Sequence, residues 1–296
     1  MLRTIASCVL GAIIPTATVT AAPLAQPRLV WQTDPVFQTP EAVLYDAQRD
    51  VLYVGNYRKT DPNEPSEFLS KVSTDGKVLA LKWVTGLDRP TGMAIHNDKL
   101  YVVERGQLAR INFDTASVEQ RYPIPGANFS NDVAFDPAGT AYISDNGQQA
   151  TTAIFRFQNG RVEPWMTTQQ ILSPNGLLVE GKDLIAFDNR RQALVRIDRT
   201  DQTVTEIAKF ASNARAIGDG IVPIAKHTYL VTAWSGESWI VGPEGTVTPL
   251  LDTNTLTPVV GQRVNHADVG YVPRKKLWII PTFFDNRLLA YEWTKP

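Results

Sequence analysis

The chain has 296 residues, a formal net charge of −1 and 43% hydrophobic residues, which is enough apolar material for a soluble protein with a large core. Charges of both signs are scattered along the chain, without a basic run. This distribution argues against a protein that binds nucleic acid or an anionic membrane surface, because both partners select a basic patch.

The first 25 residues differ from the rest. "MLRT" carries a positive charge, an uncharged and mostly apolar stretch follows, and Val19 and Ala21 fit the small-residue rule for cleavage after Ala21. This layout predicts a signal peptide over residues 1–21 and an exported protein, periplasmic or secreted. The apolar stretch is short and interrupted by Pro15, so no membrane span is expected in the mature protein.

The single cysteine, Cys8, lies inside this predicted signal peptide. After cleavage the mature protein has no thiol, which excludes disulfides, thiolate nucleophiles and zinc held by cysteine. The sequence also lacks the Walker motif, the dinucleotide glycine motif, the nucleophile-elbow serine motif and HExxH. Covalent serine or cysteine catalysis is therefore unsupported.

A repeat of four short strand candidates, separated by turn residues, runs through the rest of the chain. In the first repeat the candidates read "PEAVLYD", "VLYVGNY", "FLSKVST" and "KVLALKWV". The following repeats open with "PTGMAIH", "SNDVAFD", "NGLLVE", "GDGIVPI" and "HADVGYV". Once aligned, the six repeats start at residues 41, 91, 131, 175, 219 and 267. Four strands in 40 to 50 residues are typical of one blade of a β-propeller.

The repeats therefore predict an all-β, six-bladed β-propeller with four antiparallel strands per blade, as a single domain over residues 28–296. The sixth repeat lacks a fourth strand, while "RLVWQT" (28–33) precedes the first repeat and is otherwise unassigned. We expect this N-terminal strand to join the last blade and close the ring, which removes an open sheet edge. A sandwich or jelly roll has a similar strand density but does not explain six repeats in register.

The first residue of each repeat should lie near one mouth of the central channel. These residues are Glu41, Thr91, Asn131, Asn175, Asp219 and Ala267. Two carboxylates and two amides among them suit Ca²⁺ or Mg²⁺ better than Zn²⁺, which remains an alternative. Any one of them alone is more simply a turn residue at a strand entrance. Together they predict a metal site with open coordination positions for a substrate.

The next residue in each repeat should face another direction along the strand. This position holds Ala42, Gly92, Asp132, Gly176, Gly220 and Asp268. The glycines indicate close backbone approach. Asp132 and Asp268 should point between blades, where they either accept backbone N–H groups or orient the metal ligands. His266 could reach the mouth and join them, with a surface or capping role as the alternative.

The segments "PEAVLYD", "SNDVAFDPAGTAYISD", "SPNGLLVE" and "GDGIV", in this order and spacing, resemble the gluconolactonase family, also called the senescence marker protein or regucalcin family. They are similar, more distantly, to diisopropylfluorophosphatase and paraoxonase. The resemblance covers nearly the whole mature chain. It implies a six-bladed propeller with a divalent metal, usually calcium, in the channel, and hydrolysis of lactones or related esters. It also implies Glu41, Asn131, Asn175 and Asp219 as metal ligands and Asp219 as the acid/base residue.

One substrate-binding position departs from the family. Sugar-lactone hydrolases of the family carry an arginine two residues before the third repeat's asparagine, where this chain has Phe129. An apolar ring there favours a more hydrophobic lactone or ester. The sequence thus supports a metal-dependent hydrolase of a small molecule, in which the metal polarises a carbonyl. The alternative is a non-catalytic propeller that binds a ligand or protein around a structural metal.

Overall fold

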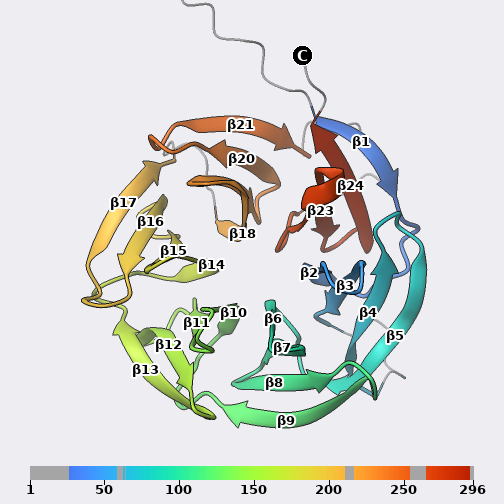
Figure 1. The fold of residues 1–296 in the computed structure, drawn as a ribbon, viewed down its shortest axis with the longest axis horizontal. Coiled ribbons are helices and arrows are strands. Elements are labelled where there is room, and N and C mark those ends of the chain that lie inside the picture. The colour runs from blue at the N-terminus through green and yellow to red at the C-terminus, as the bar shows by residue number, and fades with distance from the viewer. Residues whose placement is uncertain (1–26, 59–62, 64, 211–216, 254–264, 294–296) are drawn as a thin grey trace, which may run out of the picture.

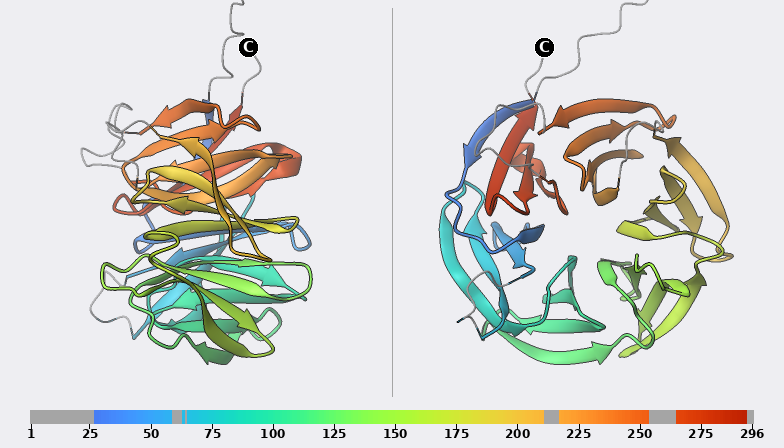
Figure 2. Two further views of the ribbon diagram at one scale, coloured as in Figure 1. Left: turned by 90° about the vertical axis from the view of Figure 1, so that its left-hand side faces the viewer. Right: turned by 180° about the vertical axis from the view of Figure 1, so that it is seen from behind.

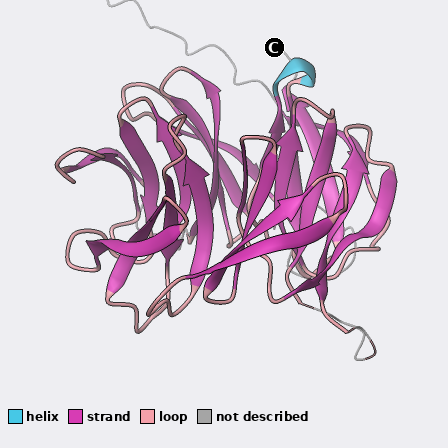
Figure 3. Cartoon of the chain, turned by 60° about the horizontal axis from the view of Figure 1, so that its bottom comes forward, coloured by secondary structure: helices cyan, strands magenta, loops and turns pink. Residues whose placement is uncertain are grey.

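A computed structural model describes residues 27–58, 63, 65–210, 217–253 and 265–293. The predicted signal peptide and Cys8 lie outside the described residues. The described chain folds into six four-stranded antiparallel sheets arranged around one axis (Figure 1). Figure 3 shows that strands dominate, with a single 3₁₀ turn, η1 (Pro273–Lys275), in the described part. The predicted all-β, six-bladed propeller is confirmed.

In the first five blades the strands run outward from the axis in chain order, and in the last blade β1 is the outermost strand. The innermost strands are β2 (Pro40–Asp46), β6 (Met93–His96), β10 (Ser130–Phe135), β14 (Pro174–Glu180), β18 (Gly218–Ala225) and β22 (Gly270–Val272). The second strands are β3 (Val51–Asn56), β7 (Lys99–Glu104), β11 (Ala141–Asp145), β15 (Asp183–Asp188), β19 (Thr228–Ala233) and β23 (Leu277–Thr282). The third strands are β4 (Glu67–Ser73), β8 (Gln107–Asn112), β12 (Thr152–Gln158), β16 (Ala193–Asp198), β20 (Glu237–Val241) and β24 (Arg287–Trp293). The outer strands are β5 (Val78–Leu87), β9 (Ser117–Pro123), β13 (Arg161–Thr167), β17 (Val204–Lys209), β21 (Val247–Asp252) and β1 (Pro27–Gln32).

The N-terminal strand is the outer strand of the last blade. β1 pairs antiparallel with β24, from Pro27 opposite Trp293 to Gln32 opposite Leu289. The last sheet therefore has the order β1-β24-β23-β22 and contains strands from both ends of the described chain. The two strands lie side by side in Figure 1 and in the right-hand view of Figure 2.

The hydrophobic core is divided into six clusters, each between two adjacent blades. One cluster joins Ile154 of the third blade to Leu184 of the fourth, and the next joins Phe187 of the fourth to Tyr229 of the fifth. Because each blade packs against a neighbour on both faces, second strands such as β3 and β23 are buried at every residue. This explains why they read as nearly continuous apolar runs.

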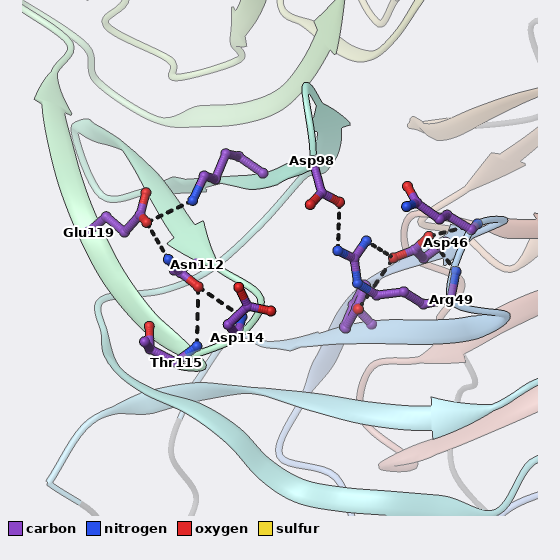
Figure 4. Close-up of polar contacts among 10 residues, drawn as sticks. Asp46, Arg49, Asp98, Asn112, Asp114, Thr115 and Glu119 are labelled. Carbon is purple, nitrogen blue, oxygen red and sulfur yellow. Dashed lines mark hydrogen bonds and ion pairs between the residues drawn. The ribbon is translucent and has the colours of Figure 1, made fainter.

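Ion pairs link adjacent blades outside these cores. Arg49, in the turn after β2, donates from Nη2 to Asp98 Oδ1 of the second blade at 2.6 Å, while Asp46 accepts from its Nη1 at 3.0 Å (Figure 4). Arg199 Nη1 and Asp136 Oδ2 form a 2.6 Å pair between the fourth and third blades. These contacts fix neighbouring blades in register with one another. No helix in the described part of the chain is long and apolar enough to cross a membrane.

Candidate functional site

The four predicted metal ligands line one cavity of about 380 Å³ at the start of the inner strands. They come from the first, third, fourth and fifth blades, and each is at most 6% exposed. They are Glu41, Asn131, Asn175 and Asp219. The corresponding residues of the other two blades, Thr91 and Ala267, are buried but do not line the cavity. The structure therefore brings the four oxygen-bearing side chains together.

Each of the four lies at a register shift in its inner strand. The pairing of β2 with β3 shifts between Pro40 and Ala42, at Glu41. Equivalent shifts occur at the other three residues, between 130 and 133, 174 and 177, and 218 and 221. The pairing of β6 with β7 in the second blade has no such shift. A β-bulge leaves extra residues unpaired and changes the direction of their side chains. The four predicted metal ligands therefore lie outside the regular alternation of the strand.

Two buried oxygens of this set accept no hydrogen bond. Asn175 Nδ2 donates to Asp219 Oδ1 at 3.0 Å, but Asn175 Oδ1 and Glu41 Oε2 have no hydrogen-bond partner among the described residues. A buried acceptor without a partner is costly. Carboxylate and amide oxygens are the ligands that Ca²⁺ and Mg²⁺ prefer, so these residues fit a hard divalent cation.

The amide oxygens are essential to this fit. In the described part of the chain, no three His, Cys, Asp or Glu side chains are grouped so that they could hold an ion. The cavity supplies two carboxylates, and the amides of Asn131 and Asn175 complete the set. A site of this composition favours oxygen-preferring cations over zinc, for which His and Cys are typical ligands.

Burial and mutual repulsion raise the pKa of the acids in the channel. The pKa of Asp219 rises to about 8, because of burial and then the charge of Asp132, opposed by the Asn175 hydrogen bond. The pKa of Glu41 rises well above its ordinary value through burial, followed by the charges of Asp219, Asp268 and Asp132. A bound cation would neutralise these like charges, which supports the same fit.

Asp132 and Asp268 face the opposite end of the channel. They line a second cavity of about 410 Å³ among the later residues of the inner strands. Asp132 accepts from the backbone N–H groups of Leu177 at 2.6 Å and Val133 at 2.7 Å. Its pKa rises to about 7, through burial opposed by these two bonds. The carboxylate thus joins the third and fourth blades, as the backbone-acceptor interpretation expected.

Asp268 joins the last blade to the first. Its N–H donates to the Glu41 carbonyl at 2.8 Å, and its own carbonyl accepts from Val43 N at 3.0 Å. Burial first, and then the charges of Asp132 and Asp219, raise the pKa of Asp268 well above its ordinary value. These backbone bonds hold the strand that carries Glu41 against the sixth blade, and the suggested role of the Asp268 side chain in orienting metal ligands stays a prediction.

The glycines beside these acids leave room for close approach, as the sequence indicated. A Cβ added at Gly92 would lie 2.6 Å from Asp132 Cα, and one at Gly220 would overlap the Asp268 carboxylate. At Gly176 an added Cβ would overlap the carbonyl oxygen of Asp219. Neighbouring inner strands can meet this closely only where a side chain is absent.

His266 is fully buried rather than at the surface, so the surface alternative was wrong. Its Nδ1 lies 3.1 Å from Ser238 Oγ, and its backbone bridges Thr282. Burial lowers the pKa of His266 to about 4, so the ring is neutral near pH 7. His266 lines neither the metal-ligand cavity nor the second cavity, and its suggested role in orienting metal ligands stays a prediction.

Phe129 lines the cavity of the predicted ligands, as expected. The carboxylate of Asp145 accepts from Asn128 N at 2.6 Å and from Phe129 N at 2.9 Å. These bonds fix the loop that enters β10. Phe129 therefore stands close to the metal-ligand set, where the sugar-lactone members of the resembled family carry arginine.

Sequence reasoning missed most of the remaining lining. Four of the missed residues directly follow the second strand of a blade: Tyr57, Asn146, Trp234 and Phe283. In an antiparallel hairpin the end of the second strand lies beside the start of the first, as the pairing of Asn56 with Pro40 shows. Aligning the second strands of the repeats, and not only the first, would have marked these positions as neighbours of the predicted ligands.

Comparisons with known proteins agree with the propeller fold. The sequence profile of the SMP-30/gluconolactonase/LRE-like region matches residues 40–257. The chain belongs to this family. Among solved structures, a protein described as a candidate gluconolactonase is similar with a TM-score of 0.68 and 17% identity, over 91% of this chain and 92% of that one. A luciferin-regenerating enzyme is similar with a TM-score of 0.63 and 13% identity, over 86% and 92%.

No curated protein matches the chain by sequence. Membership in the SMP-30/gluconolactonase family supports a lactonase-type enzyme, and the similarity to the solved structures supports the propeller fold. The family match begins at Pro40, one residue before Glu41, and includes all four predicted metal ligands. Its range ends before the sixth blade, which supplies Phe283 to the cavity.

Proposed function

We propose that this chain is a divalent-metal-dependent hydrolase of a small lactone or related ester, with calcium as the preferred ion. The observation that carries the proposal is the convergence of four buried oxygen-bearing side chains on one cavity, with Glu41 Oε2 and Asn175 Oδ1 left without donors. Glu41, Asn131, Asn175 and Asp219 would hold the ion. When bound, the ion would polarise the substrate carbonyl and stabilise negative charge on its oxygen.

Asp219 is the general base in this proposal. A water attacks the carbonyl carbon, its proton passes to the Asp219 carboxylate, and that proton then goes to the leaving alcohol oxygen as the ring or ester bond breaks. The products are a hydroxy acid from a lactone, or an acid and an alcohol from an ester. Asn175 holds Asp219 in place through the 3.0 Å bond to Oδ1, which leaves the other carboxylate oxygen for the proton transfer.

The test begins with the divalent-ion content of purified wild type, Glu41→Gln and Glu163→Gln, the last being an exposed acid on β13. We expect one ion per chain in wild type and Glu163→Gln, and a loss in Glu41→Gln. Lactone and aryl-ester panels are then measured before chelation, after chelation and after calcium is restored. The absence of a stoichiometric ion from wild type would falsify the proposal, as would turnover that survives in Asn175→Ala.

A second candidate is a non-catalytic binding propeller with a structural metal. It is favoured by the apolar lining of the cavity, in which Phe129, Trp234 and Phe283 accompany the ligand set. In that case chelation lowers the melting temperature while no panel substrate is turned over. Turnover that is lost on chelation and restored by calcium contradicts this candidate.

Export is a separate proposal that rests on residues 1–21 alone. If they form a cleaved signal peptide, the protein recovered from an export-competent host begins at Ala22. Intact-mass measurement of the exported fraction tests this directly. A recovered mass that includes residues 1–21 contradicts it.

A further inference from the structure

We propose that an aromatic wall selects an apolar, ring-containing substrate, with Trp234 as the main specificity determinant. The aromatic wall consists of Tyr57, Phe129, Trp234, Phe283 and Phe284, all of which line the metal-ligand cavity. This inference deepens the proposed hydrolase function and rests on it for the reaction, but not for the binding of apolar rings.

The wall is continuous across four blades. Phe129 lies 6.4 Å from Tyr57 between ring centroids, and Tyr57 lies 5.6 Å from Phe283. Phe283 lies 4.8 Å from Trp234 and 5.0 Å from Phe284. The Trp234–Phe283, Trp234–Phe284 and Phe283–Phe284 contacts are all edge to face. Rings held this way present a rigid apolar surface that loses little conformational entropy when a flat ligand packs on it.

Part of the wall is open to solvent. Phe284 is 50% exposed, and the neighbouring lining residue Ile217 is 47% exposed, whereas Tyr57 and Phe283 are buried. A ligand that covers exposed apolar side chains at the mouth gains free energy from their burial. The cavity volume of about 380 Å³ lies at the small end of the range for small-molecule sites, which suits a compact one- or two-ring ligand.

A sugar lactone finds few partners in this cavity. Beyond the four predicted metal ligands, the polar groups among the described lining side chains are those of Arg58 and Asn146, the Tyr57 hydroxyl and the Trp234 indole N–H. A polyol would leave hydroxyl groups unpaired against the aromatic wall, which costs roughly tenfold or more in affinity for each such group. The wall therefore discriminates against polyols as well as favouring apolar rings.

Two probes separate binding from chemistry. 3-Isochromanone is a benzo-fused δ-lactone, and 2-tetralone has the same two-ring frame with a methylene in place of the ring oxygen, so it cannot be hydrolysed. With calcium present, we expect kcat/KM for 3-isochromanone to exceed that for glucono-δ-lactone at least tenfold. We also expect calorimetry to show binding of 2-tetralone and none of glucitol at the same concentration.

Three variants assign the selectivity. Trp234 is half-buried, and Trp234→Ala should weaken 2-tetralone binding about tenfold or more, as truncation of an aromatic anchor at the centre of a binding site typically does. Phe284→Ser, at a half-exposed position that carries little risk to folding, should weaken it severalfold. Trp165→Ala removes a half-buried indole on β13 that packs on Tyr142, away from the cavity, and should leave binding unchanged.

The outcomes distinguish the two proposals. If 2-tetralone binds and both wall variants weaken its binding, but no lactone is hydrolysed, the aromatic-wall inference is supported and the hydrolase proposal fails. If glucono-δ-lactone is the better substrate, or if Trp234→Ala and Phe284→Ser bind 2-tetralone as wild type does, the wall inference is overturned while hydrolysis stands.

Discussion

The two ends of the channel differ in how their polar groups are satisfied, although the same inner strands build both. At the far end, acidic residues at or just after the last residue of an inner strand have ion-pair or hydrogen-bond partners. Asp46 binds Arg49, Asp136 binds Arg199, and Glu180 accepts from Tyr229 at 2.6 Å. At the near end, Glu41 and Asn175 keep oxygens without donors. The acids at the ends of these strands are therefore satisfied by contacts within the fold, whereas the near end keeps oxygens that the proposed cation would satisfy.

The largest expected effect concerns Asp219, the proposed base at the near end. Asp219→Asn keeps the side-chain shape but cannot take a proton, so kcat for a lactone substrate should fall roughly 10²- to 10⁴-fold. Val179→Thr, a near-isosteric change in the lining of the far cavity, should leave kcat within about threefold. Equal losses in the two variants would mean that the two ends do not differ as described.

A backbone change at the near end should cost stability. Gly176→Ala would drive a Cβ into the carbonyl oxygen of Asp219, so we expect about 2–4 kcal/mol of destabilisation in urea unfolding. The matched control is Gly55→Ala, where an added Cβ lies 3.4 Å from its nearest neighbour, the Pro90 carbonyl oxygen. Its effect should stay within about 1 kcal/mol. If both glycines tolerate alanine equally, the close approach of the inner strands is not required.

The pH dependence of stability should reveal the crowded acids when no cation is present. The pKa values of Asp132 and Asp219 rise to about 7 and about 8 in the folded protein, from about 4 in the unfolded chain. The folded state therefore holds protons that the unfolded chain has released, and the free energy of unfolding falls as pH rises through this range.

This expectation is tested by measuring the melting temperature at several pH values from about 6.5 to about 8.5, with a chelator present. Below this range His266 acts in the opposite sense, because its pKa falls to about 4 in the folded state. The melting temperature should drop by several degrees, since about 1 kcal/mol corresponds to roughly 2–4 °C for a chain near this size. Calcium should reduce the drop. A flat profile in chelator would count against the electrostatic description of the channel.

The smallest expected effect lies at the far end. Arg199→Ala removes the 2.6 Å pair with Asp136, whose side chains are 17% and 9% exposed. We expect about 1–3 kcal/mol of destabilisation with unchanged metal content. Arg28→Ala breaks the pair with Glu292, whose side chains are 59% and 30% exposed, and should cost less than about 1 kcal/mol. A loss of metal from Arg199→Ala would tie the far end to the site.

Much of the fold could be predicted because the repeat fixes the strand order. "PEAVLYD" coincides with β2, and "VLYVGNY" extends one residue beyond β3. "RLVWQT" lies one residue from the bounds of β1. The sixth inner strand was the least accurate, since only Gly270–Val272 forms a strand there. In that blade His266 and Asp268 instead make isolated bridges to Thr282 and Ala42.

The predicted part of the site consists of aligned residues with metal-binding oxygens, and the missed part consists mainly of aligned aromatic residues. Oxygen-bearing residues at four aligned positions made a recognisable set. Tyr57, Trp234 and Phe283 share an aligned position too, but an aromatic residue after a buried strand is more often part of a core. Whether such a ring faces a cavity depends on the β-bulges and turns around it, and one sequence does not encode these in a readable pattern.

The pairing of β1 with β24 has a consequence for how the protein folds during synthesis. The first strand of the ring to leave the ribosome waits for the last blade, so its ladder partner is available only when the whole propeller has been made. Until then β1 is an unpaired edge, and the loop to be closed spans nearly the entire ring. Five blades can stack in order as they emerge, while the final step joins the two ends of the chain. We expect this seam to form late and to separate early under mechanical load.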